Sequence, residues 1–269
     1  MSGLNCPVCG APLFKDARSY TCENRHNYDI ARAGYVNLLL SQKSGQKRHG
    51  DDKLMVRSRK AFLDKGYYAC LKDKIVKICQ KAGGKHIADI GCGEGYYTDA
   101  VYRALPEASA VGIDISRDAL ALAAKRNADI EWAVASSNRL PLADNSIDIL
   151  LNLFAPADEK EFLRVLKSGG ILVRAIALEK HLWGLKEKLY EKPYLNRPAA
   201  PEMAGFTGPE RIEIRRAMEL NDAADIDALF KMTPYYYKTS AADQAKLGGL
   251  AHLQTPIEFA ILIYKKSSD

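Results

Sequence analysis

The 269-residue sequence predicts an α/β protein, with a Rossmann-like, doubly wound parallel sheet preceded by a small zinc-binding module. Three observations predict this fold. Strand-like and helix-like segments alternate from about residue 51 onward. A glycine-rich loop joins the first strand of that series to a helix. Cys and His residues at metal-ligand spacing lie within the first 26 residues.

The composition is that of a globular protein. Hydrophobic residues make up 47% and charged residues 27% of the chain, which excludes a disordered, collagenous or coiled-coil protein. No apolar run approaches the ~18 residues of a membrane span, and the N-terminus has neither the basic patch nor the apolar stretch of a secretory signal. We therefore expect a cytoplasmic protein, whose six cysteines stay reduced.

The positive charge is concentrated at one end of the chain. Residues 1–60 contain 11 Lys and Arg against 5 Asp and Glu, whereas residues 61–269 are balanced, so the whole net charge of +6 belongs to the first segment. A basic segment on a neutral body indicates an anionic partner such as nucleic acid. A solvated basic face without a partner is the alternative.

The first module is predicted from a C-x2-C-x12-C-x3-H pattern formed by Cys6, Cys9, Cys22 and His26. Three thiolates and one imidazole suit tetrahedral zinc, and Gly10 permits the tight turn after the second cysteine. A segment this short has few large apolar side chains, so the metal would act as its core. A redox pair would need its C-x-x-C at a strand–helix junction, and no such pattern surrounds Cys6.

Two helices are expected between the module and the sheet. Residues 34–40 indicate a short ordered segment, and residues 41–52 a polar, basic loop. Apolar residues recur at helical spacing from about residue 51 to 63 and again from residue 68 to 78. Gly83-Gly84 ends the second helix.

The alternating series of the sheet follows. The expected strands are residues 86–90, 110–114, 130–135, 147–154 and 171–176. The expected helices are residues 97–105, 118–126 and 159–166, the last ending at Ser168-Gly169-Gly170. Residues 235–239 and 257–265 predict a terminal antiparallel pair, which gives a parallel sheet one reversed edge, as in methyltransferase-type sheets.

The glycine loop favours S-adenosylmethionine as the cofactor. The loop reads D-x-G-x-G-x-G, and Tyr96 stands where a dinucleotide-binding fingerprint requires its third glycine. Asp89 at the end of the strand would repel a pyrophosphate but can hold the α-ammonium of a methionine moiety. Asp114, at the tip of the second strand, is placed to accept hydrogen bonds from ribose hydroxyls. A phosphate-binding or purely structural turn is the alternative.

Several segments together resemble the RlmA family of 23S rRNA (guanine-N1)-methyltransferases, and the resemblance runs almost end to end. They are the zinc cluster, Gly34-Tyr35-Val36-Asn37-Leu38-Leu39, residues 89–98, Ala135-Ser136-Ser137 with Arg139-Leu140-Pro141, Phe154-Ala155-Pro156, Lys180-His181-Leu182 and Met232-Thr233-Pro234. The combination is specific because ordinary small-molecule methyltransferases lack the zinc module.

The resemblance implies a class I methyltransferase that acts on N1 of one guanine in a domain II hairpin of 23S rRNA, as a homodimer whose zinc modules help to line an RNA-binding cleft. It implies zinc ligation by Cys6, Cys9, Cys22 and His26. With the residues argued above, the expected cofactor site consists of Tyr68, Asp89, Gly91, Cys92, Gly93, Glu94, Asp114 and His181. The expected division is a zinc-binding RNA-recognition module in residues 1–40, a basic linker in 41–60 and the methyltransferase domain in 61–269.

Plainer interpretations exist for three of these residues. Without the family, Tyr68 would be assigned to the core, His181 to a capping or solvated position, and Cys92 to a small buried position. Ser136 stands where many methyltransferases carry an acidic adenine contact, so adenine recognition is expected to use backbone groups. No general base can be named from the sequence. Phe154, Tyr35 and Tyr235–Tyr237 are candidates for stacking on the base, although the last run is better explained as strand and core.

Two other functions remain open. One is a small-molecule methyltransferase with a structural zinc knob, and the other is a non-catalytic RNA-binding or assembly protein with a vestigial sheet. The intact glycine loop argues against the second.

Overall fold

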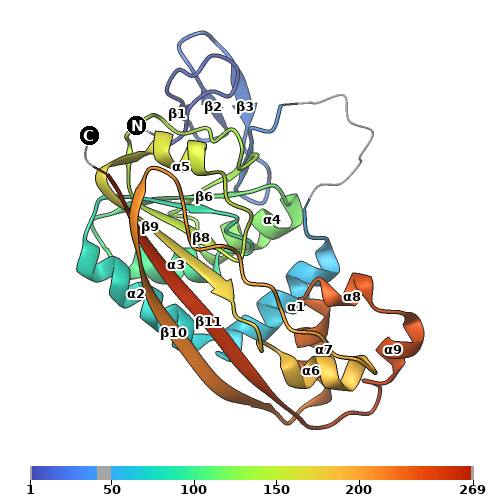
Figure 1. Cartoon of the computed structure of the whole chain (residues 1–269). Coiled ribbons are helices and arrows are strands. Elements are labelled where there is room, and N and C mark those ends of the chain that lie inside the picture. The colour runs from blue at the N-terminus through green and yellow to red at the C-terminus, as the bar shows by residue number, and fades with distance from the viewer. Residues whose placement is uncertain (1, 41–49, 268–269) are drawn as a thin grey trace.

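The computed structural model describes residues 2–40 and 50–267 (Figure 1). Figure 1 shows a small N-terminal module at one end of a larger α/β body. The module contains a three-stranded antiparallel sheet in the order β1-β2-β3. Its strands are β1 (Phe14–Lys15), β2 (Ser19–Thr21) and β3 (Asn27–Asp29), and β4 (Val36–Asn37) follows them.

The body is built on an eight-stranded sheet in the order β10-β11-β9-β8-β5-β6-β7-β4. Its other strands are β5 (His86–Ile90), β6 (Ser109–Asp114), β7 (Glu131–Val134), β8 (Ile147–Leu153), β9 (Leu166–Ala177), β10 (Phe206–Leu220) and β11 (Leu253–Lys266). The strands from β4 to β9 pair in parallel, and the chain reverses its direction of winding between β5 and β8. The predicted doubly wound α/β fold is therefore confirmed, and its switch point lies where ligands bind in such sheets.

Helices cover the sheet, and α1, α6, α7, α8 and α9 gather at the end opposite the N-terminal module (Figure 1). The helices are α1 (Lys53–Asp64), α2 (Ala69–Ala82), α3 (Tyr96–Ala104), α4 (Arg117–Arg126), α5 (Glu159–Val165), α6 (Trp183–Leu189), α7 (Ala223–Lys231), α8 (Tyr235–Lys238) and α9 (Ala241–Ala245). Asp52 caps α1 and Ser116 caps α4 through side-chain oxygens that accept from backbone amides. Gly83, with a φ of 66°, follows α2 as predicted. None of the helices in the described ranges is long and apolar enough to cross a membrane.

The predicted terminal strand pair is wrong. Tyr235–Lys238 forms the short helix α8, and the partner of β11 is β10. The aromatic run has high strand propensity, but it begins after Pro234, and Tyr236 packs edge-on against Phe230 of α7 at 5.4 Å. β11 is antiparallel to both β9 and β10, so the reversed strand lies inside the sheet and β10 forms the edge.

The start of β9 also differs from the prediction. β9 begins at Leu166, directly after α5, so Ser168-Gly169-Gly170 lie inside a strand instead of ending a helix. Gly169 adopts a φ of 76°, and the pairing of β8 with β9 shifts register between Ile147 and Ile149. Glycine is the residue that allows this irregularity without breaking the strand.

The N-terminal module is continuous with the sheet. β4 pairs in parallel with β7, and Leu38 N donates to Val134 O at 2.9 Å. Leu4 and Leu13 of the module are fully buried in the same apolar cluster as residues of β5 and β6. Residues 41–49 of the expected linker lie outside the described residues, and α1 begins at Lys53, inside the segment 41–60.

The indole ring of Trp132 on β7 packs against Gly95 of the glycine loop and Gly112 of β6. A methyl group on Gly112 would lie 2.2 Å from Cζ3 of Trp132, and one on Gly95 would lie 2.7 Å from Cη2.

We therefore expect Gly112→Ala to lower the free energy of unfolding by about 1–3 kcal/mol through overpacking, as measured by urea denaturation. An unchanged unfolding midpoint would show that the indole ring has room to move.

Candidate functional site

Four side chains of the N-terminal module converge on one point. The Sγ atoms of Cys6, Cys9 and Cys22 and a ring nitrogen of His26 all lie within 4.8 Å of one another. Cys9 Sγ is 3.7 Å from Cys22 Sγ, and His26 Nδ1 is 3.5 Å from Cys6 Sγ and 3.4 Å from Cys22 Sγ. Tetrahedral zinc with bonds of about 2.3 Å to sulfur and about 2.0 Å to nitrogen requires spacings of roughly 3.5–3.8 Å. The four residues therefore fit zinc.

Two left-handed turns place these ligands. Gly10 has a φ of 76° and donates to Cys6 O at 2.8 Å, which confirms the predicted tight turn. Arg25 has a φ of 62° and donates to Cys22 O at 2.9 Å, although no signal in the sequence singled it out. Hydrogen bonds from the Asn24 side chain and the Ala11 backbone lower the pKa of Cys9 to about 6, which favours the metal-binding thiolate.

An outer contact supports the cluster. The Tyr28 hydroxyl lies 3.1 Å from Cys6 Sγ and can donate to that sulfur when it is a thiolate. The sequence analysis missed this tyrosine because its role depends on how β3 packs beside the cysteine turn.

The glycine loop connects β5 to α3 at the carboxyl end of the sheet. Gly91, Gly93 and Gly95 all have positive φ angles, and Gly91 N donates to Ile113 O at 2.8 Å. A methyl group on Gly91 would lie 2.3 Å from Cβ of Ala155. Only glycine at this position lets the loop after β8 approach so closely.

Polar atoms without partners surround this loop. Within the described residues, three buried side-chain atoms have no hydrogen-bond partner, namely Asp89 Oδ1, Glu94 Oε1 and the Tyr97 hydroxyl. All three belong to residues 89–97. Buried polar groups are normally hydrogen-bonded, so this concentration is the pattern expected where a polar ligand supplies the missing contacts.

The two acidic groups are held in a low-dielectric environment. Asp89 is 1% exposed, and its Oδ2 accepts from Thr98 Oγ1 at 2.6 Å. Burial raises the pKa of Asp89 to about 7 and also raises the pKa of Glu94. Glu94 Oε1 is 3.8 Å from Arg126 Nη2, a distance that gives attraction without a hydrogen bond. A cationic ligand group would stabilise both carboxylates.

Asp114 is oriented by backbone amides. Its Oδ2 accepts from Gly93 N at 2.9 Å and its Oδ1 from Ser116 N at 2.8 Å. Each carboxylate oxygen has two acceptor sites, so one on each remains for the neighbouring hydroxyls of a ribose. The Ser136 hydroxyl donates to Asn138 Oδ1 at 2.6 Å.

The N-terminal end of α1 covers the glycine loop. Ser116 Oγ donates to Asp51 O at 2.7 Å, and Arg59 forms an ion pair with Asp51 at 2.6 Å. The guanidinium of Arg59 lies 3.7 Å from the position that a Cβ of Gly93 would occupy. The sequence analysis did not identify Arg59 as a residue near the glycine loop.

The structure brings Tyr68 and His181 into contact, although 112 residues separate them in the chain. The Tyr68 hydroxyl is 3.2 Å from His181 Nε2, and both side chains are buried. His181 Nδ1 accepts from Glu258 N at 3.2 Å, so the single proton of the neutral ring resides on Nε2. Burial lowers the pKa of His181 to about 3, which keeps the imidazole neutral.

The loop after β8 presents an exposed aromatic ring. Phe154 is 46% exposed and has a φ of 59°, a strained conformation for a residue with a side chain. Its ring packs edge-on against Phe259 at 5.6 Å, and Phe259 in turn contacts Tyr68 and His181. Asn152 Nδ2 donates to Ile90 O and Pro156 O, which fastens this loop to the end of β5.

Comparisons with known proteins identify both parts of the chain. Residues 4–47 match the family model described as "RlmA, N-terminal", and residues 87–170 match a model described as "Methyltransferase domain". The "23S rRNA (guanine(748)-N(1))-methyltransferase" of Streptomyces fradiae is 36% identical over 69% of this chain and 67% of its own length. The "Putative 23S rRNA (guanine-N(1)-)-methyltransferase" of Bacillus subtilis is 30% identical over 98% of both chains, and a protein of the same description from Micromonospora griseorubida is 35% identical over 69% of both.

Replacement of one metal ligand tests the zinc site. We expect Cys22→Ser to reduce bound zinc from about one ion per chain to a small fraction of that, as measured by atomic emission. Because the metal joins the turns that carry its four ligands, amides of β1–β3 should lose protection from hydrogen exchange. Amides of β5 and β8 serve as the internal control and should stay protected. Full zinc content in the variant would contradict the assignment.

Proposed function

This chain belongs to the RlmA-like family of 23S rRNA (guanine-N1)-methyltransferases, and on that premise we propose that it methylates N1 of a guanine in a domain II hairpin of 23S rRNA. The chain is an S-adenosylmethionine-dependent methyltransferase of class I fold with an N-terminal zinc ribbon. The observation that carries the proposal is the combination, in one chain, of that ribbon with unpartnered polar atoms around the glycine loop.

The cofactor site follows from the contacts around the loop. S-adenosylmethionine supplies, when bound, a methyl group activated by a positively charged sulfur. We assign Asp89 Oδ1 to the α-ammonium and the free acceptor sites of Asp114 to the ribose hydroxyls. Glu94 adds negative charge to the same cradle, while Gly91, Cys92 and Gly93 provide backbone and close approach.

Tyr68 and His181 form the second part of the proposed site. His181 donates through Nε2 to the Tyr68 hydroxyl, so the tyrosine oxygen is oriented and its own proton is free to be donated into the site. This pair provides hydrogen bonding and shape for the cofactor and the base beside it. The Tyr68 ring also packs in the core against Phe62 and Phe259, so the residue has a packing role beside the proposed one.

The target base is expected to stack on Phe154. An RNA base must leave its stack to reach a methyl donor, and an exposed aromatic ring offers it a new surface. Asn152 acts as a positioning residue, because its side-chain amide is already used to hold the loop. His181 is unsuited to remove the N1 proton, since its Nδ1 accepts from a backbone amide and its Nε2 carries the ring proton. We therefore propose that this site aligns N1 of the guanine for in-line attack on the methyl group, and that the N1 proton is lost to solvent.

A homodimer acting in the cytoplasm forms part of the same proposal. Val8 and Phe14 on the zinc ribbon are 51% and 50% exposed, so each offers an apolar side chain for a contact between subunits. Light scattering should return about twice the chain mass of 29.7 kDa. A mass of one chain at micromolar concentration would remove the dimer from the proposal.

The pH dependence of cofactor binding tests the Asp89 assignment. Because burial raises the pKa of Asp89 to about 7, some of this carboxyl is protonated below that pH, and binding a cationic ammonium expels the proton. Affinity should therefore increase with pH, by up to about tenfold per unit, and level off above about pH 8. Calorimetry in two buffers of different ionisation enthalpy measures both effects. Asp89→Asn should bind more weakly and without this pH dependence, and a flat profile for the wild-type protein would reject the assignment.

Methylation of rRNA tests the function itself. Labelled cofactor and rRNA from a strain lacking the enzyme should yield a methylated product, with a new reverse-transcriptase stop in the domain II hairpin, because N1-methylguanine blocks base pairing.

We expect Phe154→Ala to lower kcat/KM for rRNA by roughly 10- to 100-fold, the value of one stacked base, and Phe154→Tyr to restore most of it. Activity on a metabolite, with no rRNA labelled by zinc-loaded protein, would support a small-molecule methyltransferase instead.

A further inference from the structure

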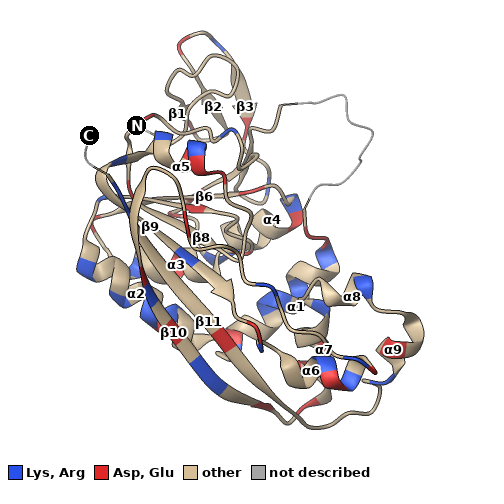
Figure 2. Ribbon diagram, viewed as in Figure 1, with Lys and Arg blue, Asp and Glu red and all other residues tan. Residues whose placement is uncertain are grey.

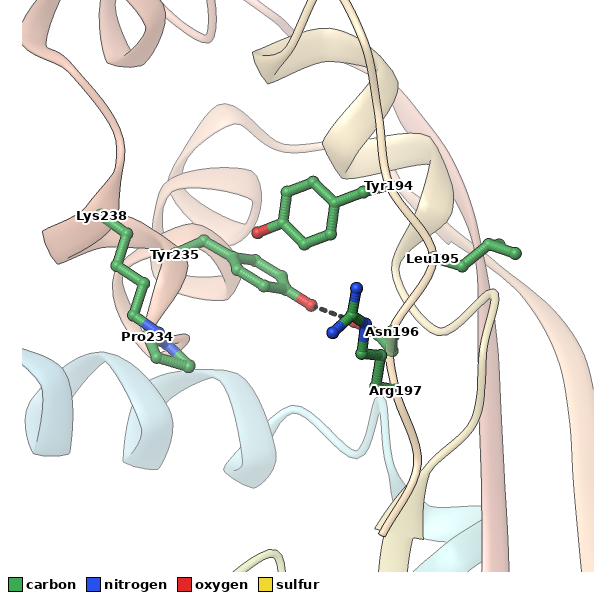
Figure 3. A pocket seen from close by; sticks show the side chains of 7 residues that line it. All are labelled: Tyr194, Leu195, Asn196, Arg197, Pro234, Tyr235 and Lys238. Atoms are coloured by element: carbon green, nitrogen blue, oxygen red, sulfur yellow. Dashed lines mark hydrogen bonds between the residues drawn. The ribbon is translucent and has the colours of Figure 1, made fainter.

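A cavity of about 670 Å³ lies between the segment after α6 and the start of α8, away from the glycine loop (Figure 3). Its volume is within the range of about 300–1,000 Å³ typical of small-ligand sites. The lining residues are Tyr194, Leu195, Asn196, Arg197, Pro234, Tyr235 and Lys238. Figure 3 shows the two tyrosine rings and the Arg197 guanidinium arranged around one space.

The lining combines aromatic rings with cations and contains no acidic residue. Arg197 and Lys238 are exposed, and within the described part of the chain neither side chain forms a hydrogen bond or ion pair. Tyr194 is 48% exposed. Unpaired cations beside accessible rings are the combination with which proteins bind single-stranded nucleic acid, pairing with phosphate and stacking on bases.

A buried lysine organises the floor of this cavity. Lys186 is 0% exposed, and its Nζ donates to Tyr194 O at 2.9 Å and to Asn196 Oδ1 at 2.6 Å. The same ammonium lies 4.3 Å from the ring centre of Tyr194 and 5.0 Å from that of Tyr235. The Tyr235 hydroxyl also donates to Asn196 Oδ1 at 2.8 Å. Both rings are thus held in place before any ligand binds, which lowers the entropic cost of stacking.

The walls of the cavity are tied to the cofactor site. Asn196 Nδ2 donates to Leu178 O and His181 O, both at 2.9 Å. On the other wall, α8 follows Met232, whose carbonyl accepts from Arg59 at 3.4 Å, and Arg59 lies beside Gly93. A ligand in this cavity would therefore contact Asn196, which is hydrogen-bonded to His181 of the proposed cofactor site.

The surface at this end of the molecule carries basic residues together with acidic ones on α6 and α9 (Figure 2). Figure 2 shows basic residues on α1 and α8 at this end of the molecule. Lys53 and Arg57 of α1 are exposed, and Tyr237 of α8 donates to Asp52 at the start of α1, which joins the two helices. Lys53 and Arg57 offer further cations to a polyanion that extends from the cavity toward α1.

From these contacts we propose that the cavity binds a nucleotide adjacent to the target guanine in the RNA strand. The base stacks on Tyr194 or Tyr235, and its phosphate pairs with Arg197 and Lys238. This inference rests on the proposed rRNA substrate, and it adds a specificity-determining contact to that function. The nucleotide is single-stranded, because a paired base could not enter beside the rings.

The test removes both cations without changing side-chain length greatly. Arg197→Gln combined with Lys238→Gln should weaken binding of a fluorescein-labelled domain II hairpin transcript roughly tenfold and reduce the dependence of log K on log salt by about one to two units. KM for rRNA should rise while kcat and cofactor affinity stay unchanged. The matched control is Lys74→Gln with Lys81→Gln, two exposed lysines of α2 on the far side of the body, which should behave as wild type.

A second pair of variants separates stacking from charge. Tyr194→Ala should weaken RNA binding without changing the salt dependence, whereas Tyr194→Phe should restore it, because the phenyl ring is enough for stacking. If wild-type protein methylates rRNA but the double variant keeps its affinity and salt dependence, the cavity inference is overturned and the proposed function stands. If wild-type protein neither binds nor methylates rRNA, the proposed function is rejected, and the cavity inference that rests on it is rejected too.

Discussion

The close approach of two backbone segments at the carboxyl end of the sheet determines the rest of the site. The loop after β8 reaches the glycine loop because Gly91 has no side chain to meet Ala155. Asn152 holds the same contact by donating to β5 and to its own loop. Phe154 and the unpartnered oxygen of Asp89 are therefore held by the same contacts, and under the proposed function these contacts would align a methyl donor with its acceptor.

The zinc ribbon packs directly against the large sheet, although it precedes the methyltransferase domain in the sequence. β4 extends the sheet beyond β7, and Leu4 and Leu13 complete an apolar cluster that begins under β5 and β6. A second cavity, of about 730 Å³, lies between the ribbon and residues 135–144 after β7, and Cys6 itself lines it. The metal ligand Cys6 and the segment after β7 therefore lie side by side.

Much of the fold and part of the site could be predicted from local patterns. The zinc ligands have fixed spacing, the glycine loop follows a buried strand, and the strands up to β9 alternate with helices, so each prediction needed only nearby residues. Tyr235–Tyr237 was misassigned because strand propensity competes with packing on α7, which the sequence does not display. β10 was missed although Ile212 and Ile214 alternate with charged residues, since its long strand lies beyond an irregular segment. No local sequence pattern predicts the roles of Arg59 and Tyr28 or the cavity at Tyr194, because each arises from contacts between distant segments.

The pairing of β4 with β7 has a consequence for how the protein behaves in concentrated solution. One border of the large sheet is β10, where Arg211, Glu213 and Arg215 carry charges that discourage another strand from docking. The opposite border is occupied by β4, and β4 is held there by a ribbon that folds around its metal. Loss of zinc would release this cover and expose the backbone of β7 as a free edge. Metal depletion should therefore promote strand-to-strand aggregation, in addition to any loss of RNA recognition.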